Sequence, residues 1–312
     1  MVLLTVHDAT DALQRAGLLG QGRVVAVERM TEGKASAVYK LQLSTGRAIV
    51  FKSAARRVVE TEVLWLRGWR EIGIDTPEVY GHGVLSDDTP FLLMEFVDGP
   101  SVWGAVEAGQ LPLEATIRET GRMLATMHTV QGVGFGSSHF DNLDAAGNGR
   151  FQTLREHLAA EALPLGLAFA VEVGDISADD LPAVERAVEL LDAHAQALGP
   201  RRTHGDFRVG NMIHHRDSSG RDRLVVIDPT PALTHPYVCL AYSLLLPQLH
   251  TGEPQVDILG GYGEVSPVDP DAFDAALLIR AGIMFNSFGR RRDTLYARRL
   301  PGVFARLRQP FI

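Results

Sequence analysis

Short strand-like segments dominate the first hundred residues of the chain. Apolar and polar positions alternate in these segments, and Ser44-Thr45-Gly46 provides a turn between two of them. Residues 8–19 and 60–69 instead carry apolar side chains at helical spacing. We therefore expect a small, mainly β domain that contains two helices. The predicted strands are residues 23–29, 37–43, 48–52, 77–80 and 91–97.

The pattern changes after Asp98-Gly99-Pro100, which breaks the last of these strands. Most of the segments that follow have the periodicity of amphipathic helices, apart from a strand-like stretch at residues 203–228. The sequence therefore predicts an α+β fold with a small, mainly β lobe at residues 1–98 and a larger, mostly helical lobe at residues 99–312. The predicted helices are residues 112–130, 154–162, 181–198, 237–249 and 271–288.

Composition is typical of a water-soluble globular protein, with 46% hydrophobic and 22% charged residues. Cys239 is the only cysteine, so an intrachain disulfide is excluded and a reducing compartment is indicated. The N-terminus has no basic start, and its apolar run is short. Apolar runs long enough to span a membrane are also missing. We expect a cytoplasmic protein, either a monomer or a homodimer.

Charge is distributed unevenly around the net value of −8. Residues 100–270 carry 22 acidic residues against 11 arginines, whereas residues 271–312 carry 8 arginines against 3 aspartates. An acidic segment disfavours nucleic acid and favours a cationic small ligand. We expect the C-terminal arginines to form ion pairs with the acidic region rather than to bind a polyanion.

A cluster of hydrogen-bonding and acidic residues lies between apolar segments in the second half of the chain. His204-Gly205-Asp206 is followed by Asn211, and the apolar run Val225-Val226-Ile227 ends at Asp228. Phosphoryl transfer needs a group that orients the attacking hydroxyl and accepts its proton, together with hard oxygen ligands that hold Mg²⁺ against the phosphates. Two aspartates and an asparagine in this order supply both requirements.

This motif resembles that of the aminoglycoside phosphotransferase and choline kinase group, small-molecule kinases with a protein-kinase-like fold. The resemblance implies that Asp206 is the catalytic base, that Asn211 and Asp228 bind Mg²⁺, and that Arg208 reaches the γ-phosphate of ATP. His204 is expected to brace the loop rather than to react. Protein kinases differ, because they carry Arg where Gly205 stands and Phe-Gly after the metal-binding Asp, where this chain has Pro229.

The same resemblance identifies a lysine and a glutamate in the first lobe. Lys52 ends the apolar segment 48–52 and is one of only three lysines in the chain. It is expected to contact the α- and β-phosphates of ATP and to pair with a glutamate on the following helix. The segment Glu60-Thr61-Glu62 offers two candidates, and we favour Glu60 over Glu62.

Two further segments are expected to bind the nucleotide. Gly33 and Ser36 lie in a loop between two predicted strands, where backbone N–H groups would cover the phosphates. The end of the segment 91–97 resembles the family hinge. There the backbones of Glu95 and Val97 would hydrogen-bond the adenine, with Met94 behind the base.

One departure from the family leaves a role unassigned. Relatives usually carry Gly-Asp-Pro followed by Tyr-Asp-Leu-Ala, whereas this chain has His235 and Cys239 in place of the two acids. The second acid normally supports the catalytic loop. The residue that supports the loop in this chain is therefore not identified by the sequence, and Cys239 is expected to pack as a small apolar side chain.

Alternative functions make different predictions. A metal hydrolase would use His204, Asp206, His214, His215 and Asp228 as ligands. His214 and His215 are neighbours on a predicted strand, however, so they point to opposite faces. A nucleotide-binding regulatory module without turnover would not need the complete set of catalytic residues. We therefore expect a kinase whose acceptor is an aminoglycoside or a basic peptide antibiotic. An amino sugar, a choline-like alcohol or another metabolite is the alternative acceptor.

Overall fold

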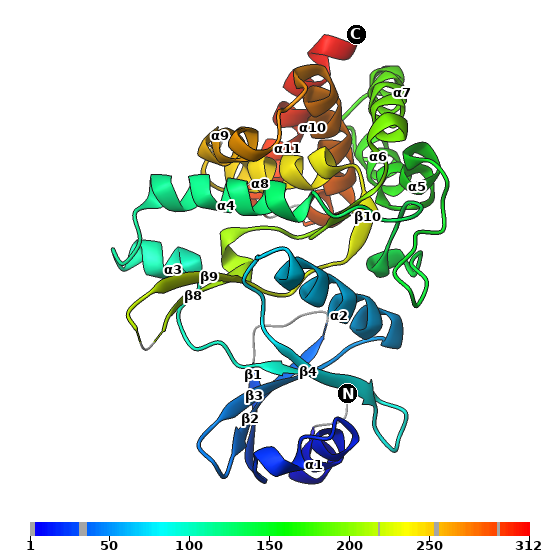
Figure 1. The fold of residues 1–312 in the computed structure, drawn as a ribbon. Coiled ribbons are helices and arrows are strands. Elements are labelled where there is room, and N and C mark those ends of the chain that lie inside the picture. Colours follow the sequence, from blue (N-terminus) through cyan, green and yellow to red (C-terminus); the bar gives the residue numbers. More distant parts are fainter. Residues whose placement is uncertain (1–3, 31–35, 218, 253–255, 292–293) are drawn as a thin grey trace. The chain divides into compact units, whose positions relative to one another are not determined.

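The structure, a computed structural model, describes residues 4–30, 36–217, 219–252, 256–291 and 294–312 (Figure 1). The chain forms two compact units that are not continuous in sequence. Unit 1 contains Met1–Ala108, Ala145–Gly147 and Gly210–Thr230, and unit 2 contains Gly109–Asp144, Asn148–Val209 and Pro231–Ile312. Unit 1 therefore includes residues 210–230 in addition to the N-terminal hundred residues. The predicted boundary at 98/99 instead divides the chain only once.

Unit 1 is built on a five-stranded antiparallel sheet of order β1-β2-β3-β5-β4. Its strands are β1 (Val24–Met30), β2 (Ala37–Leu43), β3 (Ala48–Ser53), β4 (Val79–Val84) and β5 (Pro90–Glu95). Its helices are α1 (Val6–Arg15), α2 (Arg56–Glu71) and α3 (Val102–Glu107). A capping box between Thr5 and Asp8 fixes the start of α1.

Alternation along β3 and β5 divides the side chains of this sheet between two cores. Ile49 and Phe51 pack with Ala9 and Leu13 of α1, while Val50 packs with residues of α2. Both faces of the sheet are therefore covered, and the position two residues after Val50 lies on the α2 face.

A two-stranded hairpin, β8 (Met212–Arg216) and β9 (Asp222–Val226), belongs to unit 1. The amide of His214 donates to the carbonyl of Pro100 over 2.9 Å, and that of Val226 donates to the carbonyl of Asp75 over 2.8 Å. Arg223 also forms an ion pair with Asp75 at 2.9 Å. These contacts fix the direction of β9, which leads toward Asp228.

Unit 2 is mostly helical, as the periodicity predicted. Its helices are α4 (Leu113–Met127), α5 (Leu154–Ala160), α6 (Ala162–Glu172), α7 (Leu181–Leu198), α8 (Pro236–Thr251), α9 (Val256–Val265), α10 (Pro270–Met284) and α11 (Leu295–Leu307), with a π-helical turn at Phe285–Gly289. A small sheet of order β6-β10-β7 joins Gly136–Ser137, Ala232–Thr234 and Arg201–Thr203. The predicted α+β composition is confirmed.

Helix α8 is surrounded by protein on most sides. Its first ten residues, from Pro236 to Leu245, are all buried, and it packs against α9, α10 and α11. In Figure 1, α8 lies among these helices in unit 2. Within the described part of the chain, none of the helices is long and apolar enough to cross a membrane.

Candidate active site

Lys52 lies near the end of β3, on the face of the sheet that α2 covers. Its side chain is only 5% exposed, and its Nζ atom lies 2.8 Å from a carboxylate oxygen of Glu62 and 2.6 Å from Oδ1 of Asp228. All three residues belong to unit 1. The structure therefore brings together the predicted lysine and one of the predicted metal ligands.

The glutamate that pairs with Lys52 is Glu62, so the expectation of Glu60 was wrong. Glu60 instead pairs with Arg56 at 2.9 Å and Arg57 at 3.2 Å. The helical period explains the difference, because Glu62 continues the buried stripe formed by Val59, Val63 and Leu66. That stripe was readable in the sequence and favours Glu62, which faces the sheet.

Burial and charge act together on this cluster. Burial alone would lower the pKa of Lys52, but the attraction of Glu62 and Asp228 outweighs it, so that the pKa of Lys52 is raised. Burial raises the pKa of Glu62, and Lys52 opposes that shift. Lys52 is therefore a permanent cation near neutral pH, suited to binding phosphate oxygens.

Asp228 follows β9 in a left-handed backbone conformation, with φ of 54°. This region is uncommon for residues other than glycine and is enriched in aspartate and asparagine. The amide of Ile227, the residue before Asp228, donates to the carbonyl of Asn211 over 3.0 Å, which links Asn211 to the chain just before Asp228. A carboxylate and an amide oxygen are hard donors of the kind that Mg²⁺ prefers. The donor set fits Mg²⁺, and its binding stays a prediction.

Positions predicted to bind the nucleotide base lie at the end of β5. Met94 and Val97 are 8% and 7% exposed. The amide of Glu95 already donates to the carbonyl of Glu78 over 2.8 Å. Adenine binding by the backbones of Glu95 and Val97 stays a prediction. In the phosphate loop, Ser36 precedes β2, while Gly33 lies outside the described residues.

Asp206 belongs to unit 2 and is held by a side chain that the sequence did not single out. The hydroxyl of Tyr242, on α8, donates to Oδ1 of Asp206 over 2.6 Å. Nε of Arg208 lies 3.5 Å from Oδ2, a long contact between partly exposed groups. The roles of Asp206 as base and of Arg208 as a γ-phosphate ligand stay predictions. His204 is fully buried and packs against Phe207, which fits a bracing role.

The histidines of the alternative hydrolase are directed apart, as strand geometry requires. His214 is buried and its Nε2 lies 2.8 Å from Asp222, whereas Nδ1 of His215 lies 2.8 Å from the carbonyl oxygen of Asp98. Within the described ranges, three or more His, Cys, Asp or Glu side chains do not gather as metal ligands. The structure thus offers nothing in favour of a zinc hydrolase.

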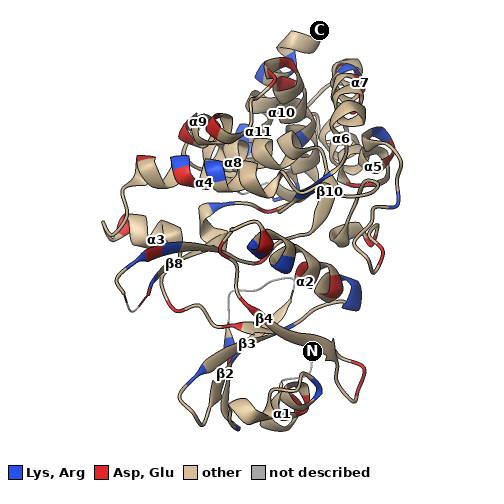
Figure 2. Cartoon of the chain, in the orientation of Figure 1, with Lys and Arg blue, Asp and Glu red and all other residues tan. Residues whose placement is uncertain are grey.

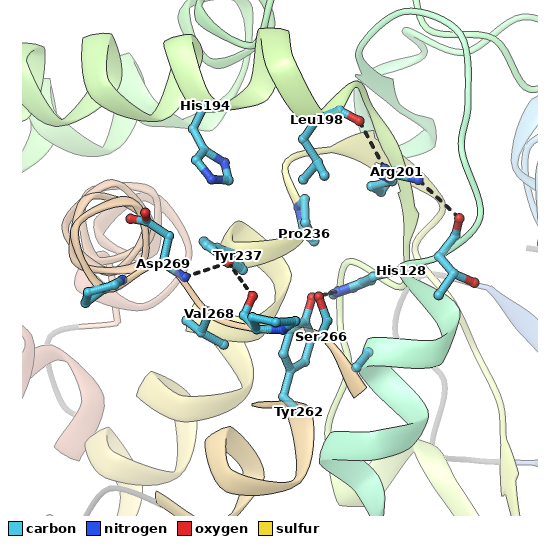
Figure 3. A pocket seen from close by; sticks show the side chains of 14 residues that line it. His128, His194, Leu198, Arg201, Pro236, Tyr237, Tyr262, Ser266, Val268 and Asp269 are labelled. Atoms are coloured by element: carbon cyan, nitrogen blue, oxygen red, sulfur yellow. Dashed lines mark hydrogen bonds between the residues drawn. The ribbon is translucent and has the colours of Figure 1, made fainter. Parts of the chain in front are cut away.

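A second histidine cluster lies beside a cavity of about 630 Å³ in unit 2 (Figure 3). Nδ1 of His128 lies 3.0 Å from the hydroxyl of Tyr262, and Nδ1 of His194 lies 2.9 Å from Nε2 of His235. The hydroxyl of Tyr237 donates to the carbonyl of Pro267 and accepts from the amide of Asp269. The lining groups thus hydrogen-bond mainly to one another, which indicates a structural network.

The tautomer of His235 follows from its contacts. Its Nδ1 accepts the amide N–H of Tyr237 over 3.2 Å and so caps α8. The neutral ring therefore carries its proton on Nε2, which donates to His194. Burial lowers the pKa of His235 to about 3, with His194 and His128 adding to the effect. This neutral imidazole caps the helix where relatives have an acid.

A buried lysine, paired with a helix glutamate and with the aspartate that follows a hairpin, defines a protein-kinase-like phosphotransferase. The chain belongs to the phosphotransferase enzyme family (APH), whose model matches residues 26–275. It is therefore a kinase that phosphorylates an alcohol group of a small molecule. The resemblance seen in the sequence is confirmed.

Solved structures share the fold. A protein named as a fructosamine-3-kinase from Thermobifida fusca YX-ER1 is 24% identical, with a TM-score of 0.60 over 95% of this chain and 98% of that one. A thermostable mutant of the aminoglycoside phosphotransferase APH(4)-Ia, in complex with AMP-PNP and hygromycin B, is 15% identical, with a TM-score of 0.64 over 98% of both chains. A comparison with curated protein sequences gave no match. At these identities the solved structures establish the fold alone.

Proposed function

We propose that the protein transfers the γ-phosphoryl group of ATP to a hydroxyl of a small cationic molecule, such as an aminoglycoside or a basic peptide antibiotic. The observation that carries the proposal is the contact of Lys52 with both Glu62 and Asp228. A buried cation beside a hard oxygen ligand is what the phosphates of a nucleotide require. APH(4)-Ia and APH(2")-IIia, whose complexes contain AMP-PNP or GDP, support nucleotide use.

The proposal assigns a role to five residues of the site. Lys52 holds the α- and β-phosphates, and Glu62 orients the ammonium group. Asn211 and Asp228 would hold Mg²⁺, which when bound neutralises charge on the phosphates. Asp206 orients the acceptor hydroxyl and takes its proton late, since the transition state is loose and requires little base strength.

The choice of a cationic acceptor rests on charge and on the relatives. Unit 2 contains 21 acidic and 16 basic residues, a smaller excess than that of residues 100–270, because the arginine-rich C-terminal segment belongs to the same unit. Some of these arginines form ion pairs with acidic residues, as Arg308 does with Asp180. Figure 2 shows that acidic and basic residues are interspersed along α4. The complexes with hygromycin B and kanamycin favour an aminoglycoside.

A second acceptor class is favoured by one comparison. The protein named as a fructosamine-3-kinase has the higher identity, at 24% against 15% for the two aminoglycoside phosphotransferases. A glycated amine or an amino sugar would use the same phosphoryl transfer chemistry. These compounds therefore belong in any test of the acceptor.

The test is ADP release against a panel of aminoglycosides, basic peptide antibiotics, amino sugars, amino alcohols and glycated amines. We expect a polycation to show the highest kcat/KM. Its KM should rise several-fold from low to high salt, because exposed charges are screened over about 8 Å at physiological ionic strength. The KM for ATP should change less. Chelation should abolish turnover, and Mg²⁺ or Mn²⁺ should restore it.

Three outcomes would contradict parts of this proposal. A neutral or anionic acceptor with the highest kcat/KM would remove the cationic preference and leave the kinase assignment. Tight ATP binding without turnover for any acceptor would favour the regulatory module. Turnover that does not require Mg²⁺ and is enhanced only by Zn²⁺ would favour the metal hydrolase.

A further inference from the structure

Helix α8 presents two hydrogen-bonding side chains to the loop that carries Asp206. The hydroxyl of Tyr242 donates to Oδ1 of Asp206 over 2.6 Å, and the hydroxyl of Ser243 donates to the carbonyl of Phe207 over 2.9 Å. Cys239 is buried on the same helix. Residues 239, 242 and 243 have i, i+3 and i+4 spacing, so they share one face of α8.

This face supplies the support that the sequence left unassigned. Burial raises the pKa of the Cys239 thiol, so this group is neutral and only a weak hydrogen-bonding partner. The hydroxyls of Tyr242 and Ser243 are therefore the groups that hold the loop.

We propose that Tyr242 is the positioning residue for the catalytic carboxylate, and that Ser243 holds the loop backbone next to it at Phe207. The donated hydrogen bond fixes the orientation of the Asp206 carboxylate through its Oδ1 atom. This inference rests on the proposed function, in which Asp206 is the base. Tyr242 itself does not contact the substrate in this assignment.

The surroundings of Tyr242 suit it to this role. Its side chain is 8% exposed, and the guanidinium of Arg280 lies 4.3 Å from the centre of its ring. Burial and the neighbouring Asp206 raise the pKa of Tyr242, so its hydroxyl stays protonated and acts as the donor. A hydrogen bond from a neutral donor to a carboxylate is short and strong, in agreement with the 2.6 Å distance.

The test compares two tyrosines of the same helix. Tyr242→Phe removes the hydroxyl that contacts Asp206, whereas Tyr237→Phe removes a hydroxyl that bonds Pro267 and Asp269 and does not contact the loop. We expect Tyr242→Phe to lower kcat by roughly tenfold to a hundredfold, the range for losing one bond to a charged group. The KM values for nucleotide and acceptor should stay within about twofold. Tyr237→Phe should lower the melting temperature and leave kcat unchanged.

A further variant tests the backbone contact. Ser243→Ala removes the hydroxyl that donates to the carbonyl of Phe207. We expect kcat to fall by less than in Tyr242→Phe, because the hydrogen bond to the carboxylate is kept. An unchanged kcat at an unchanged melting temperature would overturn the role of Ser243.

The variant Asp206→Asn distinguishes a failure of the positioning role of Tyr242 from a failure of the proposed function. If Asp206→Asn abolishes turnover while Tyr242→Phe keeps the full kcat, the positioning role is wrong and Asp206 remains the base. If Tyr242→Phe and Tyr237→Phe lower kcat equally, the effect is a loss of folding stability and the positioning role is again wrong. If Asp206→Asn keeps full turnover, the proposed function itself fails.

Discussion

At the scale of single residues, the side-chain period of each element decides which groups meet. Alternation along β3 directs Lys52 to the same face as Val50, and the helical period of α2 directs Glu62 to the face of Val59 and Val63. The two charged groups therefore meet in a buried layer that is otherwise apolar. The cost of burying Lys52 is offset by two carboxylates, because an unpaired charge there would be strongly destabilising.

Glu62 and Glu60 provide a matched comparison, since they lie two residues apart on α2. Glu62→Gln leaves Lys52 with Asp228 alone, and we expect a loss of unfolding free energy on the order of 3 kcal/mol, together with weaker ATP binding. Glu60→Gln removes contacts of partly exposed arginines and should cost less than about 1 kcal/mol. Chemical denaturation and calorimetric ATP titration would measure both effects. Equal effects of the two substitutions would show that the pairing described for Lys52 is wrong.

At the scale of elements, the sequence predicted most strands and helices correctly. The strands 37–43 and 48–52 and the helix 181–198 agree with β2, β3 and α7 to within one residue. Strong periodicity and clear turn residues explain this agreement. The sequence singled out Lys52 and Asp228, whose side chains the structure shows in contact, while their roles stay predictions.

Other features depended on contacts between segments distant in the chain. The preference for Glu60 came from a family pattern, and the buried stripe on α2 would have corrected it. The attachment of β8–β9 to unit 1 depends on backbone bonds to Asp75 and Pro100, which leave no local signal. Tyr242 was missed because it lies in a uniformly apolar segment, where a tyrosine is expected to pack as a core residue.

The close packing of α4 against α9 depends on Gly121, and the substitution Gly121→Ala tests this. A Cβ atom at Gly121 would lie 2.1 Å from the carbonyl oxygen of Ile258 and 2.8 Å from the amide of Tyr262. Gly121→Ala must therefore separate the helices, and we expect a loss of about 1–3 kcal/mol in unfolding free energy, the usual cost of overpacking. Thermal or urea denaturation would measure it.

Gly302, in α11, is the control for this prediction. A Cβ atom there has no neighbour within 4 Å, so Gly302→Ala adds a better helix former without a clash. It should stabilise the protein by about 0.5–1 kcal/mol. A stabilising effect of Gly121→Ala would show that α4 and α9 are not in close contact.

At the scale of the whole molecule, the buried histidines of unit 2 link stability to pH. His128 and His235 are 5% and 0% exposed, and each is neutral in the folded protein. Burial lowers the pKa of His128 to about 3, with contributions from His204 and Arg201, and it lowers the pKa of His235 to a similar value. In the unfolded chain both imidazoles titrate near 6.5.

Stability should therefore fall as pH drops below about 6.5, because the unfolded chain then binds protons that the folded chain excludes. The stabilising contribution is complete above the unfolded pKa and continues to be lost until the pH reaches the folded value near 3. Each histidine contributes roughly 2 kcal/mol between pH 7 and pH 5, which follows from the linkage relation. Urea denaturation at several pH values in that window would measure the slope. His128→Gln should reduce the slope by about half, while His139→Gln, at an exposed position, should leave it unchanged. An unaltered slope in His128→Gln would show that this imidazole is protonated in the folded protein.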